Sequence, residues 1–243
     1  MCIDDKGVVL RCVKYDDKSF IAHLFTVSHG HVSFMVNGAR GKRSGTAARL
    51  FQPLSLLSFQ WEAKPLATLH RMKEARLLFV PVDIPLHPVK RAMAMLVAEF
   101  MAHALREESV NSDLYEYVEH SLRWLDIAER DFANFHLVFL LKLARFLGFA
   151  PNVATYEDGA LFDLMRGCFV PDGVVSETVA NAACASYLYR LAGSSYETMS
   201  AVAMSRQDRS ALVACLARYF SLHIPKFPEI HSLEVMQMLF DEV

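Results

Sequence analysis

The sequence predicts an α+β protein, in which a small N-terminal β-barrel precedes a larger all-helical domain. Three observations indicate this arrangement. Short apolar runs rich in β-branched residues fill the first 80 residues, prolines interrupt the chain directly afterwards, and apolar residues then recur at helical spacing. A chain of 243 residues has room for two such domains. We therefore expect domains at residues 1–80 and 81–243, with the boundary near Pro81, Pro85 and Pro88.

Apolar runs predict five strands in the N-terminal domain, at Gly7–Val13, Ser19–Thr26, Val32–Val36, Pro53–Trp61 and Leu66–Leu78. A long connection rich in Gly, Ser, Arg and Lys separates the third strand from the fourth, and it closes with one helical turn at Thr46–Leu50. Five strands with this spacing fit the OB-fold, a Greek-key barrel that commonly binds oligonucleotides. An SH3-like barrel fits nearly as well.

Helical periodicity predicts seven helices in the second domain, at Val89–Glu108, Leu114–Arg130, Phe132–Leu147, Thr178–Ala192, Glu197–Ala203, Arg206–Ser221 and Leu233–Leu239. The third of these is apolar nearly all round, which is typical of the central helix of a bundle. Residues 152–177 are irregular, and we expect a small hairpin there from Gly159–Leu164 and Cys168–Pro171.

Polar residues supply the expected helix starts. Asn111 or Ser112 can cap the second helix, and Asp131 can cap the third. Ser205 with Asp208 resembles a capping box ahead of the sixth helix.

Charge is divided unequally along the chain. The first 80 residues hold twelve Lys and Arg against six Asp and Glu, a balance of +6. The remaining residues must carry −8, because the whole chain carries −2. A split of this size favours an anionic partner for the first domain, although a solvated basic face would explain it equally well.

A basic loop is the strongest candidate site. Arg40, Lys42 and Arg43 lie within four residues on a glycine-rich stretch, with Arg49 just beyond. Flexible cations on a backbone with free N–H groups suit recognition of phosphates. The complete set of expected nucleic-acid contacts is Arg40, Lys42, Arg43, Arg49, Arg11, Lys14 and Lys18. Tyr15, Phe20 and Phe34 either stack on bases or pack in the core, and core packing is favoured least for Tyr15.

Other chemistries find little support in the sequence. The five cysteines are scattered without a C-x-x-C pair, and we expect no metal, cofactor or catalytic residue. His23, His29 and His31 could bind zinc, but no carboxylate joins them at a ligand spacing. Cys168 is better explained as a buried hairpin residue than as a nucleophile. With no signal peptide and no apolar run of about 18 residues, we expect a cytoplasmic, nucleoid-associated protein without a membrane partner.

Several short motifs, taken in order along the chain, resemble the RecO family of bacterial recombination mediators. They are Gly7-Val8-Val9-Leu10, Ser19, Phe25-Thr26 with Gly30, Gly38-Ala39-Arg40-x-Lys42-Arg43-Ser44 with Gln52-Pro53, Leu147-Gly148-Phe149-x-Pro151, Tyr219-Phe220-x-Leu222-His223 and Ser232-Leu233-Glu234-Val235. The resemblance spans nearly the whole chain, although no single motif would suffice.

The resemblance implies an N-terminal OB-fold, a helical domain and no catalytic turnover. It implies binding of single- and double-stranded DNA, annealing of complementary strands, and partnership with RecR. It also implies contact with the C-terminal tail of single-stranded-DNA-binding protein, so that RecA is loaded. By position, Arg40, Lys42 and Arg43 take the DNA-contacting role of the family's loop.

The chain departs from the family at two places. Many members carry a four-cysteine zinc module where Ala150–Val175 here holds only Cys168, so we expect a zinc-free hairpin. Asp17-Lys18 stands where the family often has Glu-Thr. An RNA-binding OB-fold protein and a protein-binding scaffold remain alternatives; methionines of the acidic half (Met93, Met95, Met199, Met204, Met236 and Met238) either line a peptide groove or fill the core.

Overall fold

The computed structural model describes residues 2–16, 19–37, 50–63, 67–106 and 109–241. The chain packs into two compact units. The first consists of Met1–Leu86 with Met101–Asp126, and the second consists of His87–Phe100 with Ile127–Val243. The helix that follows the proline-rich segment contributes residues to both units.

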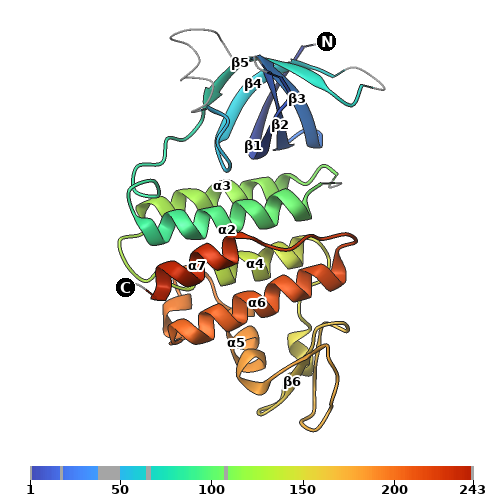
Figure 1. Cartoon of the computed structure of the whole chain (residues 1–243), viewed down its shortest axis with the longest axis vertical. Coiled ribbons are helices and arrows are strands. Elements are labelled where there is room, and N and C mark those ends of the chain that lie inside the picture. Colours follow the sequence, from blue (N-terminus) through green and yellow to red (C-terminus); the bar gives the residue numbers. More distant parts are fainter. Residues whose placement is uncertain (1, 17–18, 38–49, 64–66, 107–108, 242–243) are drawn as a thin grey trace. The chain divides into compact units, whose positions relative to one another are not determined.

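Five strands form the barrel of the first unit: β1 (Cys2–Lys14), β2 (Ser19–Thr26), β3 (Gly30–Asn37), β4 (Leu56–Glu62) and β5 (His70–Leu77) (Figure 1). β1 pairs antiparallel with both β2 and β4, while β3 pairs parallel with β5. The barrel is therefore closed in the order β1-β2-β3-β5-β4. All five expected strands are present, and the barrel is the OB-fold rather than the SH3-like alternative.

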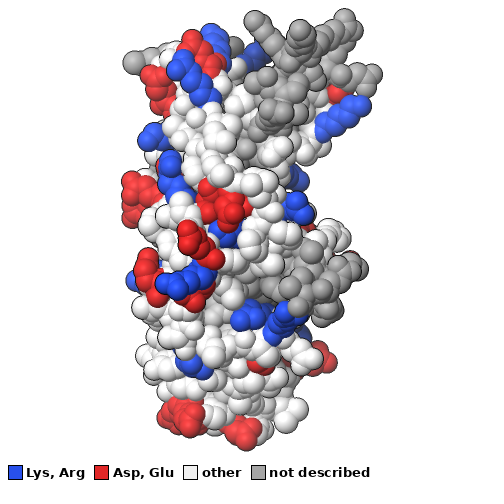
Figure 2. Space-filling model, turned by 90° about the vertical axis from the view of Figure 1, so that its left-hand side faces the viewer, with Lys and Arg blue, Asp and Glu red and all other residues white. Residues whose placement is uncertain are grey.

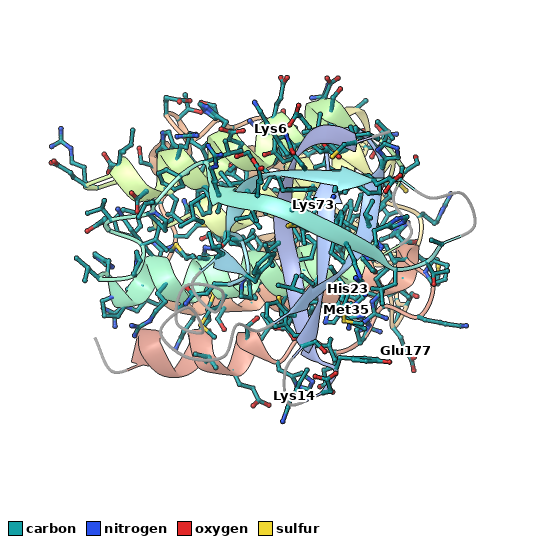
Figure 3. The ribbon with its side chains drawn as sticks, turned by 90° about the horizontal axis from the view of Figure 1, so that it is seen from above. Lys6, Lys14, His23, Met35, Lys73 and Glu177 are labelled. Atoms are coloured by element: carbon teal, nitrogen blue, oxygen red, sulfur yellow. The ribbon has the colours of Figure 1, made fainter. Side chains whose placement is uncertain are left out.

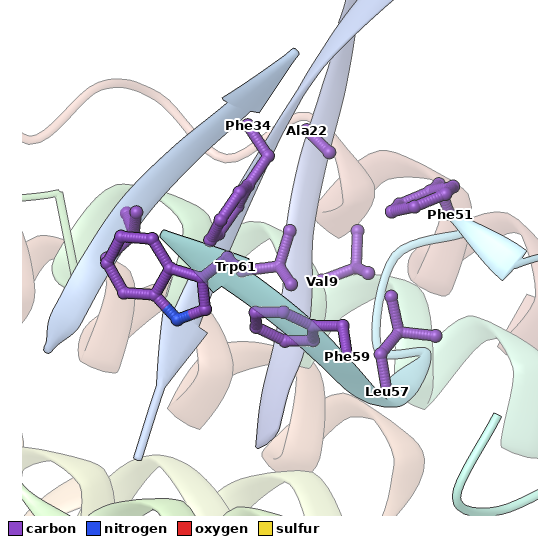
Figure 4. Close-up of a cluster of buried hydrophobic side chains, with 9 residues drawn as sticks. Val9, Ala22, Phe34, Phe51, Leu57, Phe59 and Trp61 are labelled. Atoms are coloured by element: carbon purple, nitrogen blue, oxygen red, sulfur yellow. The ribbon is translucent and has the colours of Figure 1, made fainter. Parts of the chain in front are cut away.

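Alternate residues of the strands point into the barrel and build its core. Val9, Leu57 and Phe59 lie in this cluster with the rings of Phe34 and Trp61 (Figure 4). Phe34 meets Phe59 and Trp61 edge-on, with ring centroids 5.2 and 5.3 Å apart. Such edge-to-face pairs add to the stabilisation from apolar burial and fix the positions of the rings.

The chain that leaves the barrel is held by one buried carboxylate. Asp126 accepts hydrogen bonds from the backbone N–H groups of Val82, Asp83 and Ile84, at 2.9 to 3.0 Å. Arg123, one helical turn earlier, lies over the ring of Phe79 at 5.0 Å. These contacts tie the segment after β5 to the end of the helix that carries Asp126.

Six α-helices are described in the two units: α2 (Pro88–Ala104), α3 (Ser112–Ile127), α4 (Phe135–Phe146), α5 (Ala182–Ala192), α6 (Arg206–His223) and α7 (Ser232–Asp241). α4 is buried over nearly its whole circumference, which confirms it as a central helix. Asn111 caps α3 through a hydrogen bond to Leu114 N, and the capping box of Ser205 and Asp208 is present at α6.

Some helix boundaries differ from expectation. Asp131 does not cap α4: it has a φ of 63°, and Asn134 occupies the N-cap position. The amide of Asn134 instead donates to the carbonyls of Met199 and Val202 and accepts from Arg209 Nε. The helix expected at Glu197–Ala203 is only a 3₁₀ turn, η2 (Met199–Ala201), and the carbonyls of Met199 and Val202 accept hydrogen bonds from the Asn134 side chain rather than from a continuing helix.

The expected hairpin is present and is part of a slightly larger sheet. β6 (Leu161–Asp163) pairs with β7 (Cys168–Val170), and a 3₁₀ turn, η1 (Val153–Thr155), precedes them. Residues placed at the start of a helix by the sequence form a third strand instead, β8 (Val179–Ala180), which pairs with β6. α5 consequently begins at Ala182, where the Asn181 side chain accepts a hydrogen bond from Cys184 N.

Candidate nucleic-acid interface

The predicted contact residues fall into two groups. Arg40, Lys42, Arg43, Arg49 and Lys18 lie outside the described residues. Arg11 and Lys14 lie near the end of β1, and both are exposed. Two of the seven expected cations can therefore be placed: Arg11 lies opposite His23 on the outer side of the barrel, and Lys14 lies opposite Phe20 at the end of the β1–β2 pair.

The outer side of β1, β2 and β3 brings Arg11 next to a pair of histidines. Arg11 lies opposite His23 across the β1–β2 pair, and His23 lies opposite Ser33 across the β2–β3 pair. Ser33 Oγ is 2.9 Å from His23 Nδ1. The ring of His31 stacks on that of His23, with centroids 5.6 Å apart and planes 17° apart. Figure 3 labels His23, which belongs to β2, and Met35, which belongs to the neighbouring strand β3.

The electrostatics of this face are basic. Burial lowers the pKa of His23 to about 4, helped by the charges of Arg11, His31 and Arg106. Burial also lowers the pKa of His31, with further effects from Arg11 and Arg106. The charged groups that act on both imidazoles are thus cationic. At neutral pH the two histidines are uncharged, and the positive charge of the face comes from Arg11 and Arg106.

Arg106 is the residue that sequence reasoning missed. It follows the end of α2 and is exposed, with one guanidinium nitrogen 2.9 Å from His103 Nδ1. It belongs to the same compact unit as the barrel, although it lies 57 positions after Arg49, the nearest cation of the expected set in the sequence. No local signal marks it, because its position depends on how residues 101–126 pack in this unit.

The three candidate aromatic residues have different positions. Phe34 is completely buried in the barrel core, so the hypothesis that it stacks on bases is wrong. Phe20 is partly buried and packs edge-on against Phe51 at 5.4 Å. Tyr15, at 63% exposed, presents its ring to solvent beside Lys14. Only Tyr15 combines an accessible ring with a neighbouring cation.

The histidines do not assemble into a metal centre in the part of the chain that the structure describes. No group of three or more His, Cys, Asp or Glu side chains there has the geometry to hold an ion. His23 and His29 bond to Ser33 and Ser28 through their Nδ1 atoms. Cys168, at the start of β7, is partly buried.

The described methionines of the helical unit are divided between buried and accessible positions. Met93, Met199 and Met236 are buried, whereas Met95 is 49% exposed. Three methionines therefore fill the core, and a groove built on them is not available to a peptide. Figure 2 shows a face on which basic and acidic side chains are interspersed, so the charge asymmetry of the sequence does not appear there as a uniform patch.

No described helix is both long enough and apolar enough to cross a membrane.

Comparison with known proteins places the whole chain in one family. Residues 1–80 match the family model described as recombination protein O N terminal, and residues 87–233 match recombination protein O C terminal. The DNA repair protein RecO of Phocaeicola vulgatus is 40% identical over 234 residues, covering 96% of this chain and 97% of that protein. RecO of Bacteroides fragilis is 39% identical, over 97% of this chain and 98% of the relative. RecO of Porphyromonas gingivalis is 32% identical, over 99% and 100%. The chain therefore belongs to the RecO family of DNA repair proteins.

Proposed function

We propose that the protein is a non-enzymatic recombination mediator. It binds single- and double-stranded DNA, anneals complementary strands and, together with RecR, helps to load RecA onto single strands coated by single-stranded-DNA-binding protein. The observation that carries the proposal is the outer face of an OB-fold barrel, on which exposed Arg11 lies beside the stacked rings of His23 and His31 and the charge of Arg106 acts on both rings. The proposed setting is the cytoplasm, in association with the nucleoid.

The barrel face suits a phosphate backbone for physical reasons. Guanidinium groups form forked, charge-assisted hydrogen bonds to phosphate, and they stay charged at any physiological pH. OB-folds commonly bind strands along the face of their second and third strands. The loop cations Arg40, Lys42 and Arg43, with Arg49, Lys14 and Lys18, extend this basic surface in the proposal.

The acidic helical half supplies the protein contacts in this proposal. Residues 81–243 are proposed as the domain that meets RecR and the C-terminal tail of single-stranded-DNA-binding protein. The separate family models for residues 1–80 and 87–233 support proposing a division between them.

Strand annealing tests the proposal directly. Two complementary fluorescent oligonucleotides should pair faster with the protein than without it. The variant R40A/K42A/R43A should lose most of this acceleration, while R166A, in the turn between β6 and β7, should keep it. Equal rates with and without the wild-type protein would refute the proposed function.

Competition separates two alternatives. A tighter grip on RNA than on DNA of matched sequence would favour an RNA-binding protein. If the protein binds neither DNA nor RNA, and if it forms oligomers that dissociate at high salt, the result would favour a protein-binding scaffold.

A further inference from the structure

The described part of the barrel contains a pocket that shares His31 and Ser33 with the interface above and is otherwise lined by different residues. It lies between the start of β3, the end of β4 and the start of β5, and its volume is about 550 Å³. Its walls include His29, His31, Trp61 and His70. A volume of this size is in the range of small-molecule sites in proteins.

Four of the nine described residues that line the pocket carry flat rings. The ring of His29 meets Trp61 edge-on at 4.8 Å, and that of His70 meets Trp61 edge-on at 4.9 Å. Trp61 is 2% exposed and is fixed by its place in the barrel core. A planar heterocycle entering between these imidazoles finds aromatic partners on more than one side.

Some polar groups of the pocket are already hydrogen-bonded within the protein, and one has no partner among the described residues. His29 Nδ1 is 2.7 Å from Ser28 Oγ, and Ser28 in turn donates to the buried carboxylate of Asp5. His70 Nδ1 is buried and has no hydrogen-bond partner among the described residues. A buried polar atom without a partner costs free energy, which a ligand with a complementary donor or acceptor would recover.

A second, smaller pocket adjoins the first and adds positive charge. Its volume is about 250 Å³, and it shares His70 with the first pocket. Arg71 and Lys73 line it together with a single carboxylate, that of Glu62. An aromatic compartment and a mainly cationic compartment therefore meet at one histidine.

We propose that these two pockets bind one unstacked nucleotide of a single strand, with the base between the imidazoles and its phosphate at Arg71 and Lys73. This inference rests on the proposed function and deepens it, because it places a base-binding site on the barrel. A base in a duplex is paired and stacked, so it cannot enter the pocket. The site therefore distinguishes single strands from duplexes. Contacts to phosphates alone distinguish them only weakly.

Intrinsic fluorescence provides the test. The chain has two tryptophans, so W124F leaves Trp61, at the pocket wall, as the sole tryptophan. Titration of this protein with single-stranded oligonucleotide should quench the Trp61 emission, and the matched duplex should not. The same titration is repeated with single-stranded RNA and with free thymidine monophosphate, since both present unpaired bases. Quenching by any of these ligands supports the pocket, and their relative affinities show which ligand it prefers.

Variants make the test specific. H70A should lower single-strand affinity about tenfold, the effect of losing one stacked base, with duplex affinity unchanged. H29A removes an exposed ring from the same wall and guards against a folding defect in H70A. H120A, an exposed histidine of α3, should bind like the parent.

Two outcomes overturn different claims. The W124F protein could bind single strands with no change in Trp61 emission, and H70A and H29A could bind them with unchanged affinity. That result refutes the pocket but leaves the proposed function intact. A parent protein that binds no nucleic acid at all refutes the proposed function.

Discussion

Asp5 and Trp61 are joined inside the barrel: Oδ2 of Asp5 accepts a hydrogen bond from Nε1 of Trp61 at 3.1 Å. Asp5 belongs to β1 and Trp61 to β4, so the bond reinforces the pairing of these strands. The same carboxylate accepts from Lys6 N at 2.8 Å and from Ser28 Oγ. A buried carboxylate is thus supplied with donors from three parts of the barrel.

Removing this carboxylate should destabilise the protein. D5A leaves the indole and backbone donors without a buried acceptor, and we expect it to lower the free energy of unfolding by about 2–3 kcal/mol. Urea denaturation followed by circular dichroism measures the change. D4A is the matched control: Asp4 is exposed and accepts a hydrogen bond from Gln60 Nε2 at 2.8 Å, so its effect should be within about 0.5 kcal/mol. Equal losses in both variants would contradict the assigned role of Asp5.

His136 should make the stability of the protein depend on pH. It is completely buried in α4, neither ring nitrogen has a partner among the described residues, and burial lowers its pKa from 6.5 to about 3. The unfolded chain therefore takes up a proton below pH 6.5 that the folded chain does not. Stability is complete above pH 6.5 and is lost as the pH falls toward 3. Between pH 7 and pH 5 the loss from this group should be about 2 kcal/mol.

The variant H136L isolates this effect. It should be at least as stable as the wild type at pH 7, because it removes two unpartnered polar atoms, and its loss between pH 7 and pH 5 should be smaller by about 2 kcal/mol. H120L, at an exposed position, should keep the wild-type pH dependence. Identical pH dependence of H136L and wild type would show that His136 is not buried in the neutral form.

Arg106 should contribute to DNA binding although it lies outside the expected set. R106A and R11A should each weaken single-strand binding and reduce the slope of log affinity against log salt by about 0.7, the value for one phosphate contact. Fluorescence anisotropy at several salt concentrations gives both quantities. R166A, which also removes one exposed arginine, should change neither. An unchanged slope in both R106A and R11A would exclude these residues from the interface.

The hairpin should hold without zinc. Elemental analysis of the purified protein should find no zinc above background, and a chelator should leave the unfolding temperature unchanged, because structural zinc contributes directly to folding. About one zinc per chain would contradict the argument from the missing cysteines.

The sequence was sufficient for the features that depend on local pattern. An apolar run predicted β2 at its observed limits, and the apolar residues on nearly all sides of α4 predicted its central place. Features set by tertiary packing were missed. Asn134 rather than Asp131 is the N-cap residue of α4, and its side chain bonds to Met199, Val202 and Arg209 instead of the helix; the short β8 pairs with β6. The same holds for the site: Arg11 could be proposed from its strand, whereas Arg106 and the ring pocket at His70 required the fold.

Single-strand binding across a salt series tests the central claim most directly. If five cations of the barrel contact the backbone, the slope of log affinity against log salt should be about −3.5, and affinity should fall roughly a hundredfold between 50 and 200 mM salt. The variant R40A/K42A/R43A should bind more weakly with a shallower slope. Binding that is independent of salt, or unchanged in this variant, would contradict the account of a basic barrel that grips DNA through its phosphates.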